Sequence, residues 1–182
     1  MVRVMTGPRK PKEIRLGHDV AGQVEAVGRN VSQFKPGDAV FGTCKGAFAE
    51  YVCASESALV LKPDNVAFEQ AASVPIAALT ALQGLRLGGM GIDGLGDKGQ
   101  IQPRPEVLIN GASGGVGTFA VQIAKSFGAD VTGVCSTRNV EMVRSIGADR
   151  VVDYMKHWNE MTKRRKLESP VQVIGLFCPP FI

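Results

Sequence analysis

The stretch Asn110–Arg138, NGASGGVGTFAVQIAKSFGADVTGVCSTR, decides the fold of this chain. A glycine-rich turn lies between two apolar runs, at 106–110 and 131–135, and it opens an amphipathic helix at about 116–127. A helix around 141–146 and a strand at 150–154 continue the alternation. The pattern predicts a βαβαβ unit, which is half of a doubly wound parallel sheet with right-handed crossovers. We expect the three strands to be parallel and adjacent, with the turn at the carboxyl edge of the first.

The turn Ala112–Gly117 matches the GxGxxG dinucleotide fingerprint at its second and third glycines, and Ala112 takes the place of the first. Gly114 would let a pyrophosphate approach the backbone, and Gly117 would let the helix pack closely against the strand. The start of the helix then offers free N–H groups and a positive dipole end. We therefore expect a dinucleotide here; the alternative is a glycine-rich turn that holds no ligand.

The second strand of the unit indicates which dinucleotide binds. An NAD site usually has Asp or Glu about 20 residues after the glycines, where it binds the ribose 2′-hydroxyl. Here Ser136, Thr137 and Arg138 stand at that place. Hydroxyl groups and a guanidinium bind a 2′-phosphate, so the sequence favours NADPH. The alternative is that Ser136 caps the following helix and Arg138 is solvated.

The remaining sequence predicts a β unit before this one. Three strand-like runs, at 20–28, 39–44 and 46–54, are separated by glycines and by a Pro-Gly-Asp turn at 36–38. Residues 68–87 have helical composition, with Pro75 starting a second helix or kinking a longer one, and 88–99 predict a flexible loop. Beyond residue 154, only 171–177 resemble a strand. The predicted domains are a β domain at 1–65, a nucleotide-binding half at 66–155 and a divergent tail at 156–182.

Composition narrows the class of protein. The net charge of +4 comes largely from basic clusters at 9–12 and 163–166, which lack interleaved aromatic residues, so solvated loops are favoured over nucleic-acid contacts. The four cysteines form no CxxC pair, which is typical of a reducing cytosol. No apolar run approaches about 18 residues, so no membrane partner is expected. We expect a cytoplasmic protein that acts on a small molecule.

Several motifs together resemble the medium-chain dehydrogenase/reductase superfamily, and within it the zinc-independent quinone oxidoreductases. Besides the turn, they are GHDVAGQVEAVG (17–28), FKPGDAVFG (34–42), GAFAEYV (46–52), AASVPIAALTA (71–81) and GADRVVDY (147–154). The resemblance covers about residues 9–155 and implies a partial GroES-like β domain followed by a partial Rossmann domain, with NADPH between them. It implies that the cofactor contacts Ser113, Gly115, Val116, Ser136 and Tyr154, with Tyr154 near the 2′-phosphate. It also implies that Thr80 lies near the nicotinamide side and that family members form homodimers, largely through a portion of the fold that this sequence lacks.

The resemblance implies NADPH-dependent reduction of a quinone or of an activated alkene or carbonyl. Family members have more catalytic domain before Gly17 and three further strands after Tyr154, so the chain looks like a central fragment with impaired activity. No His or Lys stands out as a proton donor, and the catalytic residues are unassigned. The alternative is a non-catalytic fragment that binds nucleotide or other proteins.

The run at 17–31 also resembles the zinc alcohol dehydrogenase signature, in which the histidine binds zinc and Glu follows it; here Asp19 follows His18. A catalytic zinc needs three protein ligands. The family's third ligand would fall in the helix with Ala77, Ala78 and Leu79, which cannot bind metal. The closely spaced cysteines of a structural zinc are missing too. We therefore expect no metal and a polar role for His18, with a zinc-type alcohol dehydrogenase fragment as the alternative.

Overall fold

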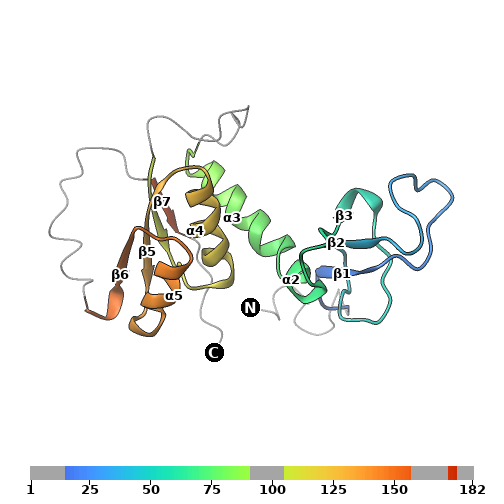
Figure 1. Cartoon of the computed structure of the whole chain (residues 1–182), viewed down its shortest axis with the longest axis horizontal. Helices are drawn as coiled ribbons and strands as arrows, with labels where there is room; N and C mark the ends of the chain where they lie inside the picture. Colours follow the sequence, from blue (N-terminus) through green and yellow to red (C-terminus); the bar gives the residue numbers. More distant parts are fainter. Residues whose placement is uncertain (1–14, 91–104, 157–171, 176–182) are drawn as a thin grey trace, which may run out of the picture. The chain divides into compact units, whose positions relative to one another are not determined.

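The structure is a computed structural model that describes residues 15–90, 105–156 and 172–175 (Figure 1). It forms two compact units, Met1–Ile76 and Ala77–Ile182, each of which is considered by itself. No helix among the described residues combines the length and apolar character that crossing a membrane requires.

The first unit is a three-stranded antiparallel sheet in the order β1-β2-β3, formed by Asp19–Gln23, Ala39–Thr43 and Leu59–Leu61. The 3₁₀ helix η1 (Glu56–Ala58) leads into β3, and α2 (Phe68–Ala72) follows the sheet. Gly37 adopts a φ of +94°, so the predicted Pro-Gly-Asp turn is present between β1 and β2. Val40 and Ala71 are buried in this unit.

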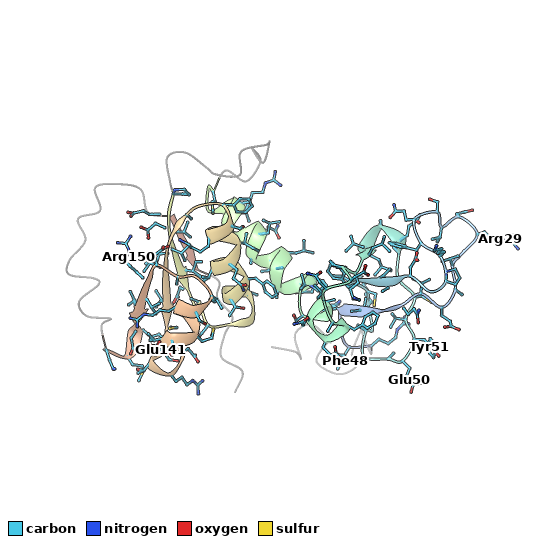
Figure 2. All side chains as sticks on the ribbon, viewed as in Figure 1. Arg29, Phe48, Glu50, Tyr51, Glu141 and Arg150 are labelled. Atoms are coloured by element: carbon cyan, nitrogen blue, oxygen red, sulfur yellow. The ribbon has the colours of Figure 1, made fainter. Side chains whose placement is uncertain are left out.

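The predicted strand at 46–54 is wrong, because this segment forms turns and bends and the third strand is β3. Gly46 has a φ of +80°, which breaks an extended backbone at the start of the segment. Phe48 is 83% exposed and Tyr51 is 77% exposed, and Figure 2 shows both side chains projecting away from the sheet. The apolar residues that suggested a strand therefore have no sheet face to pack against.

The second unit contains the predicted βαβαβ order. Its elements are α3 (Pro75–Leu87, which starts in the first unit), β4 (Glu106–Asn110), α4 (Gly115–Ser126), β5 (Asp130–Cys135), η3 (Thr137–Asn139), α5 (Val140–Ser145), β6 (Arg150–Asp153) and β7 (Gln172–Gly175). Pro75 begins α3 as a separate helix, which confirms the first of the two predicted arrangements. The pairs β4–β5 and β5–β6 are parallel and adjacent, as the sequence predicts.

A fourth strand, β7, joins this sheet from the segment that the sequence analysis assigns to a tail. The order is β6-β5-β4-β7, and β7 runs parallel to β4, with Leu108 opposite Val173. The chain thus proceeds from β4 to β5 and β6 in one direction and returns to the other side of β4. In doubly wound sheets this reversal next to the first strand is where ligands bind, beyond the carboxyl ends of the strands.

One apolar core holds the second unit together. In Figure 1, α4 and α5 lie beside the strands that they connect. Fully buried side chains from β4, β5 and the helices form the core, and α3 contributes to it through Ala81 and Leu85; the other main members are Val107, Ile109, Ala120, Val121, Ala124, Val131 and Val143. Burial of these side chains stabilises the sheet on which the loops at its edges rest.

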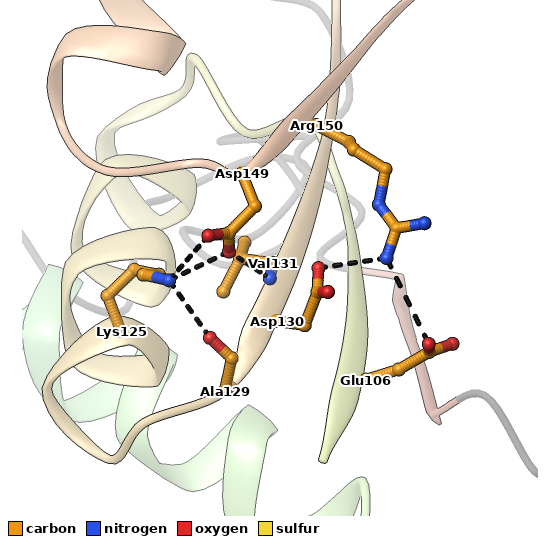
Figure 3. Close-up of polar contacts among 7 residues, drawn as sticks. All are labelled: Glu106, Lys125, Ala129, Asp130, Val131, Asp149 and Arg150. Carbon is orange, nitrogen blue, oxygen red and sulfur yellow. Dashed lines mark hydrogen bonds and ion pairs between the residues drawn. The ribbon is translucent and has the colours of Figure 1, made fainter. Parts of the chain in front are cut away.

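Ion pairs hold the amino edge of the sheet, opposite the glycine turn (Figure 3). Arg150, the first residue of β6, places Nη2 2.9 Å from Oδ1 of Asp130 and 3.9 Å from Oε1 of Glu106, which begin β5 and β4. On the helix side, Lys125 Nζ donates to both carboxylate oxygens of Asp149 at 2.8 Å. Oδ2 of Asp149 also accepts the N–H of Val131 at 2.7 Å. These contacts fix the starting points of the three strands relative to one another and to α4.

Candidate functional site

The carboxyl ends of β4, β5 and β6 lie side by side. Asn110 is opposite Val134, and Cys135 is opposite Asp153 in the parallel register. The segments that leave these strands, at 111–114, 136–138 and 154–156, therefore emerge at one edge of the sheet. This is the edge at which the sequence predicts nucleotide binding.

The turn after β4 is anchored to β5. The N–H groups of Gly111 and Ala112 both donate to the carbonyl of Val134, at 3.1 and 3.0 Å. Gly111 has a φ of +76°, so the sharp bend lies one residue before the position that the fingerprint assigns to the first glycine. Ala112 is fully buried, and its Cβ would lie 3.0 Å from a Cβ on Gly133, so the glycine at 133 makes room for the turn.

The start of α4 offers unpaired donors. Gly114 is the residue before the helix, with an extended backbone, and its N–H donates to the Gly111 carbonyl at 2.9 Å. The first N–H groups of a helix have no acceptor within the helix. Within the described ranges, no hydrogen bond takes up the N–H groups of Gly115, Val116 or Gly117. With the positive end of the helix dipole they form a favourable place for an anion.

The glycines of the turn differ in the space around them. A Cβ on Gly117 would collide with the carbonyl oxygen of Gly111 and would lie 2.9 Å from backbone atoms of Ala112. A Cβ on Gly114 would lie 3.3 Å from the Gly111 oxygen. A Cβ on Gly115 would meet nothing within 4 Å. Gly117 therefore serves helix–turn packing, whereas the space over Gly115 is open and lies beside unpaired N–H groups. Such unpaired N–H groups suit an anion such as a phosphate.

The Asn139 side chain, which the sequence did not single out, connects the turn after β4 to the loop after β5. Asn139 Nδ2 lies 3.1 Å from Ser113 Oγ and 3.2 Å from Ser136 Oγ. The structure thus brings together two of the predicted site residues, one after β4 and one after β5. Ser136 precedes η3 and makes no side-chain hydrogen bond to it, so its hydroxyl does not cap the following helix.

The other predicted residues are less closely tied to the turn. Arg138 lies exposed in η3, and Tyr154 follows β6 and is 45% exposed. Thr80 is exposed on α3, and no hydrogen bond of the described residues connects it to the turn. Its predicted place near the nicotinamide stays a prediction.

Two buried groups lie behind the edge. Cys135 ends β5 next to Asp153, which ends β6. Burial raises the pKa of the Cys135 thiol, and the negative charge of Asp153 raises it further. Asp153 Oδ1 accepts the N–H of Met155 at 3.0 Å, so its carboxylate supports the chain where it leaves β6.

The zinc alternative needs three ligating side chains close together. Nowhere in the ranges 15–90, 105–156 and 172–175 do three His, Cys, Asp or Glu side chains gather in a way that could hold a metal. Ala77, Ala78 and Leu79 lie on α3, as expected. Asp19 Oδ1 accepts the N–H of Ile76 at 2.8 Å, so this carboxylate binds the first turn of α3.

Comparison with protein families matches both units. The alcohol dehydrogenase GroES-like domain matches residues 1–64, and the zinc-binding dehydrogenase family matches residues 115–175, which includes β7. The human mitochondrial NAD(P)H oxidoreductase RTN4IP1 is 45% identical over 145 residues, which cover 78% of this chain and 35% of that protein. The chain spans less than half the length of the curated relatives that it matches.

Solved structures agree with the family match. The quinone oxidoreductase from Coxiella burnetii superposes with a TM-score of 0.74 at 31% identity, covering 95% of this chain and 51% of that one. A mycobacterial protein in complex with NADPH superposes with a TM-score of 0.63 at 30% identity, covering 80% and 45%. Enoyl reductases match as well. With a GroES-like antiparallel sheet followed by a parallel sheet that carries a glycine-rich turn, the chain belongs to the medium-chain dehydrogenase/reductase superfamily of oxidoreductases.

Proposed function

We propose that the chain binds NADPH at the carboxyl edge of β4, β5 and β6 and serves its oxidation by a small molecule. One observation carries the proposal: the open space over Gly115 lies beside unpaired N–H groups at the start of α4. The N–H groups of Gly115 and Val116 would hold the pyrophosphate.

The preference for NADPH over NADH rests on the loop after β5. Ser136, Thr137 and Arg138 occupy the place where an NAD site usually has a carboxylate, so nothing in this loop repels a 2′-phosphate. Arg138 and the hydroxyl of Ser136 would bind that phosphate through charge-assisted hydrogen bonds, with Tyr154 beside them. Similar structures include both a mycobacterial protein in complex with NADPH and an NAD-dependent alcohol dehydrogenase, so the preference rests on this loop alone.

When bound, NADPH supplies a hydride; the protein supplies binding and orientation. The described residues of the edge hold the adenosine and phosphate parts, and we assign Thr80 to the nicotinamide side. We infer that the substrate is a quinone or an activated alkene or carbonyl, because quinone oxidoreductases and enoyl reductases are among the similar structures. Homodimer formation and a cytoplasmic location stay predictions.

The test is calorimetric titration of the purified chain with NADPH, NADH and adenosine 2′,5′-bisphosphate, followed by an assay of NADPH oxidation with a simple quinone. We expect NADPH to bind more tightly than NADH, and the bisphosphate to bind nearly as well as NADPH, because the assigned contacts are to the adenosine half. Equal affinity for NADPH and NADH would contradict the cofactor assignment.

The second candidate function is nucleotide binding without turnover. It is favoured by the observation that the donors at this edge, the N–H groups at the start of α4 and the hydroxyls of Ser113 and Ser136, suit phosphates. We expect weak quinone reduction from these groups alone, because hydride transfer needs the nicotinamide held within about 1 Å of its reactive position and the assigned contacts are to the phosphates. A turnover of about 1–1000 per second, which is ordinary for enzymes, would contradict that expectation.

A further inference from the structure

We propose that Asn139 is a positioning residue that turns the hydroxyl groups of Ser113 and Ser136 outward as donors to two different phosphates of the nucleotide. This inference rests on the proposed function, because it concerns the same edge of the sheet. It gives a specific role to Asn139, which lies outside the GxGxxG fingerprint.

The Asn139 side chain makes two hydrogen bonds. Nδ2 lies 3.1 Å from Ser113 Oγ and 3.2 Å from Ser136 Oγ, and both contacts are partly buried. An amide nitrogen carries two hydrogens and only donates, whereas a hydroxyl oxygen accepts with its lone pairs and carries one hydrogen of its own. Each serine therefore uses its oxygen as acceptor toward Asn139, and each keeps its hydrogen available for a further acceptor.

The position of Asn139 shows that this arrangement is not ordinary helix capping. Asn139 directly precedes α5, where an asparagine side chain usually accepts an N–H of the first turn. Here it makes no such bond. Its side chain reaches across to Ser113, which is 26 residues away in the sequence, while its own N–H donates to the Ser136 carbonyl at 2.9 Å.

The two serines serve different parts of the ligand. Ser113 lies in the turn at the start of α4, where the pyrophosphate would bind, and Ser136 follows β5, where the ribose 2′-phosphate would bind. Because one amide group orients both hydroxyls, its loss affects both phosphates, whereas the loss of either serine affects one. This difference separates positioning by Asn139 from a direct contact of either serine.

The experiment measures calorimetric affinities of the full chain for ADP, which lacks a 2′-phosphate, and for adenosine 2′,5′-bisphosphate. We expect Ser136→Ala to weaken only the bisphosphate. We expect Asn139→Ala to weaken both ligands about fivefold, which is the size of one net hydrogen bond. In the Ser113→Ala/Ser136→Ala background, Asn139→Ala should cause no further loss. Arg144→Ala, an exposed substitution on α5, is the matched control and should leave both affinities unchanged.

Asn139→Asp keeps the shape of the side chain and replaces the donor by an acceptor. The serine hydroxyls then donate to the carboxylate and present no hydrogen to a phosphate, so the loss should exceed that of Asn139→Ala for both ligands. Wild-type affinity of the Asn139→Asp variant for both ligands would overturn the inference. It would also be overturned if Asn139→Ala reduced the affinity equally in the wild type and in the Ser113→Ala/Ser136→Ala background. Failure of the wild-type chain to bind either ligand would instead refute the proposed function, and the inference with it.

Discussion

The glycines at 115 and 117 allow a paired prediction, because alanine at the two positions should have opposite effects on stability. A Cβ on Gly117 collides with the backbone of Gly111 and Ala112, which cannot move aside as a flexible side chain would. Overpacking of this kind costs about 1–3 kcal/mol or more in the free energy of unfolding. A Cβ on Gly115 meets nothing within 4 Å, and exchange of a helical glycine for alanine gains up to about 1 kcal/mol.

The same Cβ on Gly115 occupies the space assigned to the phosphate. If it displaces the phosphate from one charged hydrogen bond, the affinity falls by about 1.5–3 kcal/mol, which corresponds to roughly 10- to 150-fold. We therefore expect Gly115→Ala to be as stable as the wild type or more stable and to bind NADPH poorly. Gly117→Ala should unfold at a clearly lower temperature.

Thermal unfolding followed by circular dichroism, with and without NADPH, and calorimetric titration measure both effects. In the wild type, saturating NADPH should raise the unfolding temperature, and in Gly115→Ala this increase should largely disappear. Undiminished NADPH affinity in Gly115→Ala would refute the assignment of the open space to a phosphate. Equal destabilisation by the two substitutions would refute the distinction between a packing glycine and a ligand glycine.

Three further predictions concern other parts of the second unit. Arg138→Asp should weaken NADPH by about 1–3 kcal/mol and leave NADH almost unchanged, because the lost contact is to the 2′-phosphate; equal losses in titrations of the two cofactors would exclude Arg138 as the discriminator. Lys125→Met removes the ammonium group that pairs with Asp149 at the amino edge and should lower the free energy of unfolding by about 1–2 kcal/mol in urea titrations without changing the affinity for NADPH; a change in affinity would mean that the two edges are coupled. Because its folded-state pKa is raised, Cys135 should stay protonated as pH rises through the pKa of an unfolded cysteine, so its contribution to stability falls from about pH 8.5 upward. At pH 8, iodoacetamide followed by peptide mass spectrometry should therefore modify the exposed Cys53 first and Cys135 only on unfolding; fast labelling of Cys135 in the folded chain would contradict its burial.

The parallel half of the fold could be predicted from sequence because its signals are local and agree with one another. The apolar run at 106–110, the glycine turn and the periodic helix each point to the same βαβ unit, and the structure confirms them. The pairing of β7 could not be predicted, because nothing local in 171–177 indicates which strand lies beside it. The prediction of a strand at 46–54 is wrong for a related reason. Alternating apolar residues form a strand only where they can pack against a neighbouring layer, and Phe48 and Tyr51 are exposed.

In the candidate site too, some features could be predicted from the sequence and others could not. The fingerprint located the turn, but it placed the tight bend at Ala112, whereas Gly111 adopts the positive φ. The Asn-Gly pair at 110–111 is a known turn signal and could have located the bend. Asn139 offered no such signal, because an asparagine before a helix predicts a cap. Its actual partner, Ser113, is brought near only by the parallel register of β4 and β5.

The placement of β7 has a consequence for how the chain folds. Leu108 pairs with Thr132 across a short crossover, whereas its pairing with Val173 closes a far longer loop of chain. Because the entropy lost on closure grows with loop length, contacts among β4, α4, β5, α5 and β6 should form first and β7 should dock late. The turn after β4 and the loop after β5 both belong to the early group. A refolding chain should therefore acquire affinity for phosphates before its sheet is complete, and nucleotide present in the refolding buffer should stabilise that intermediate.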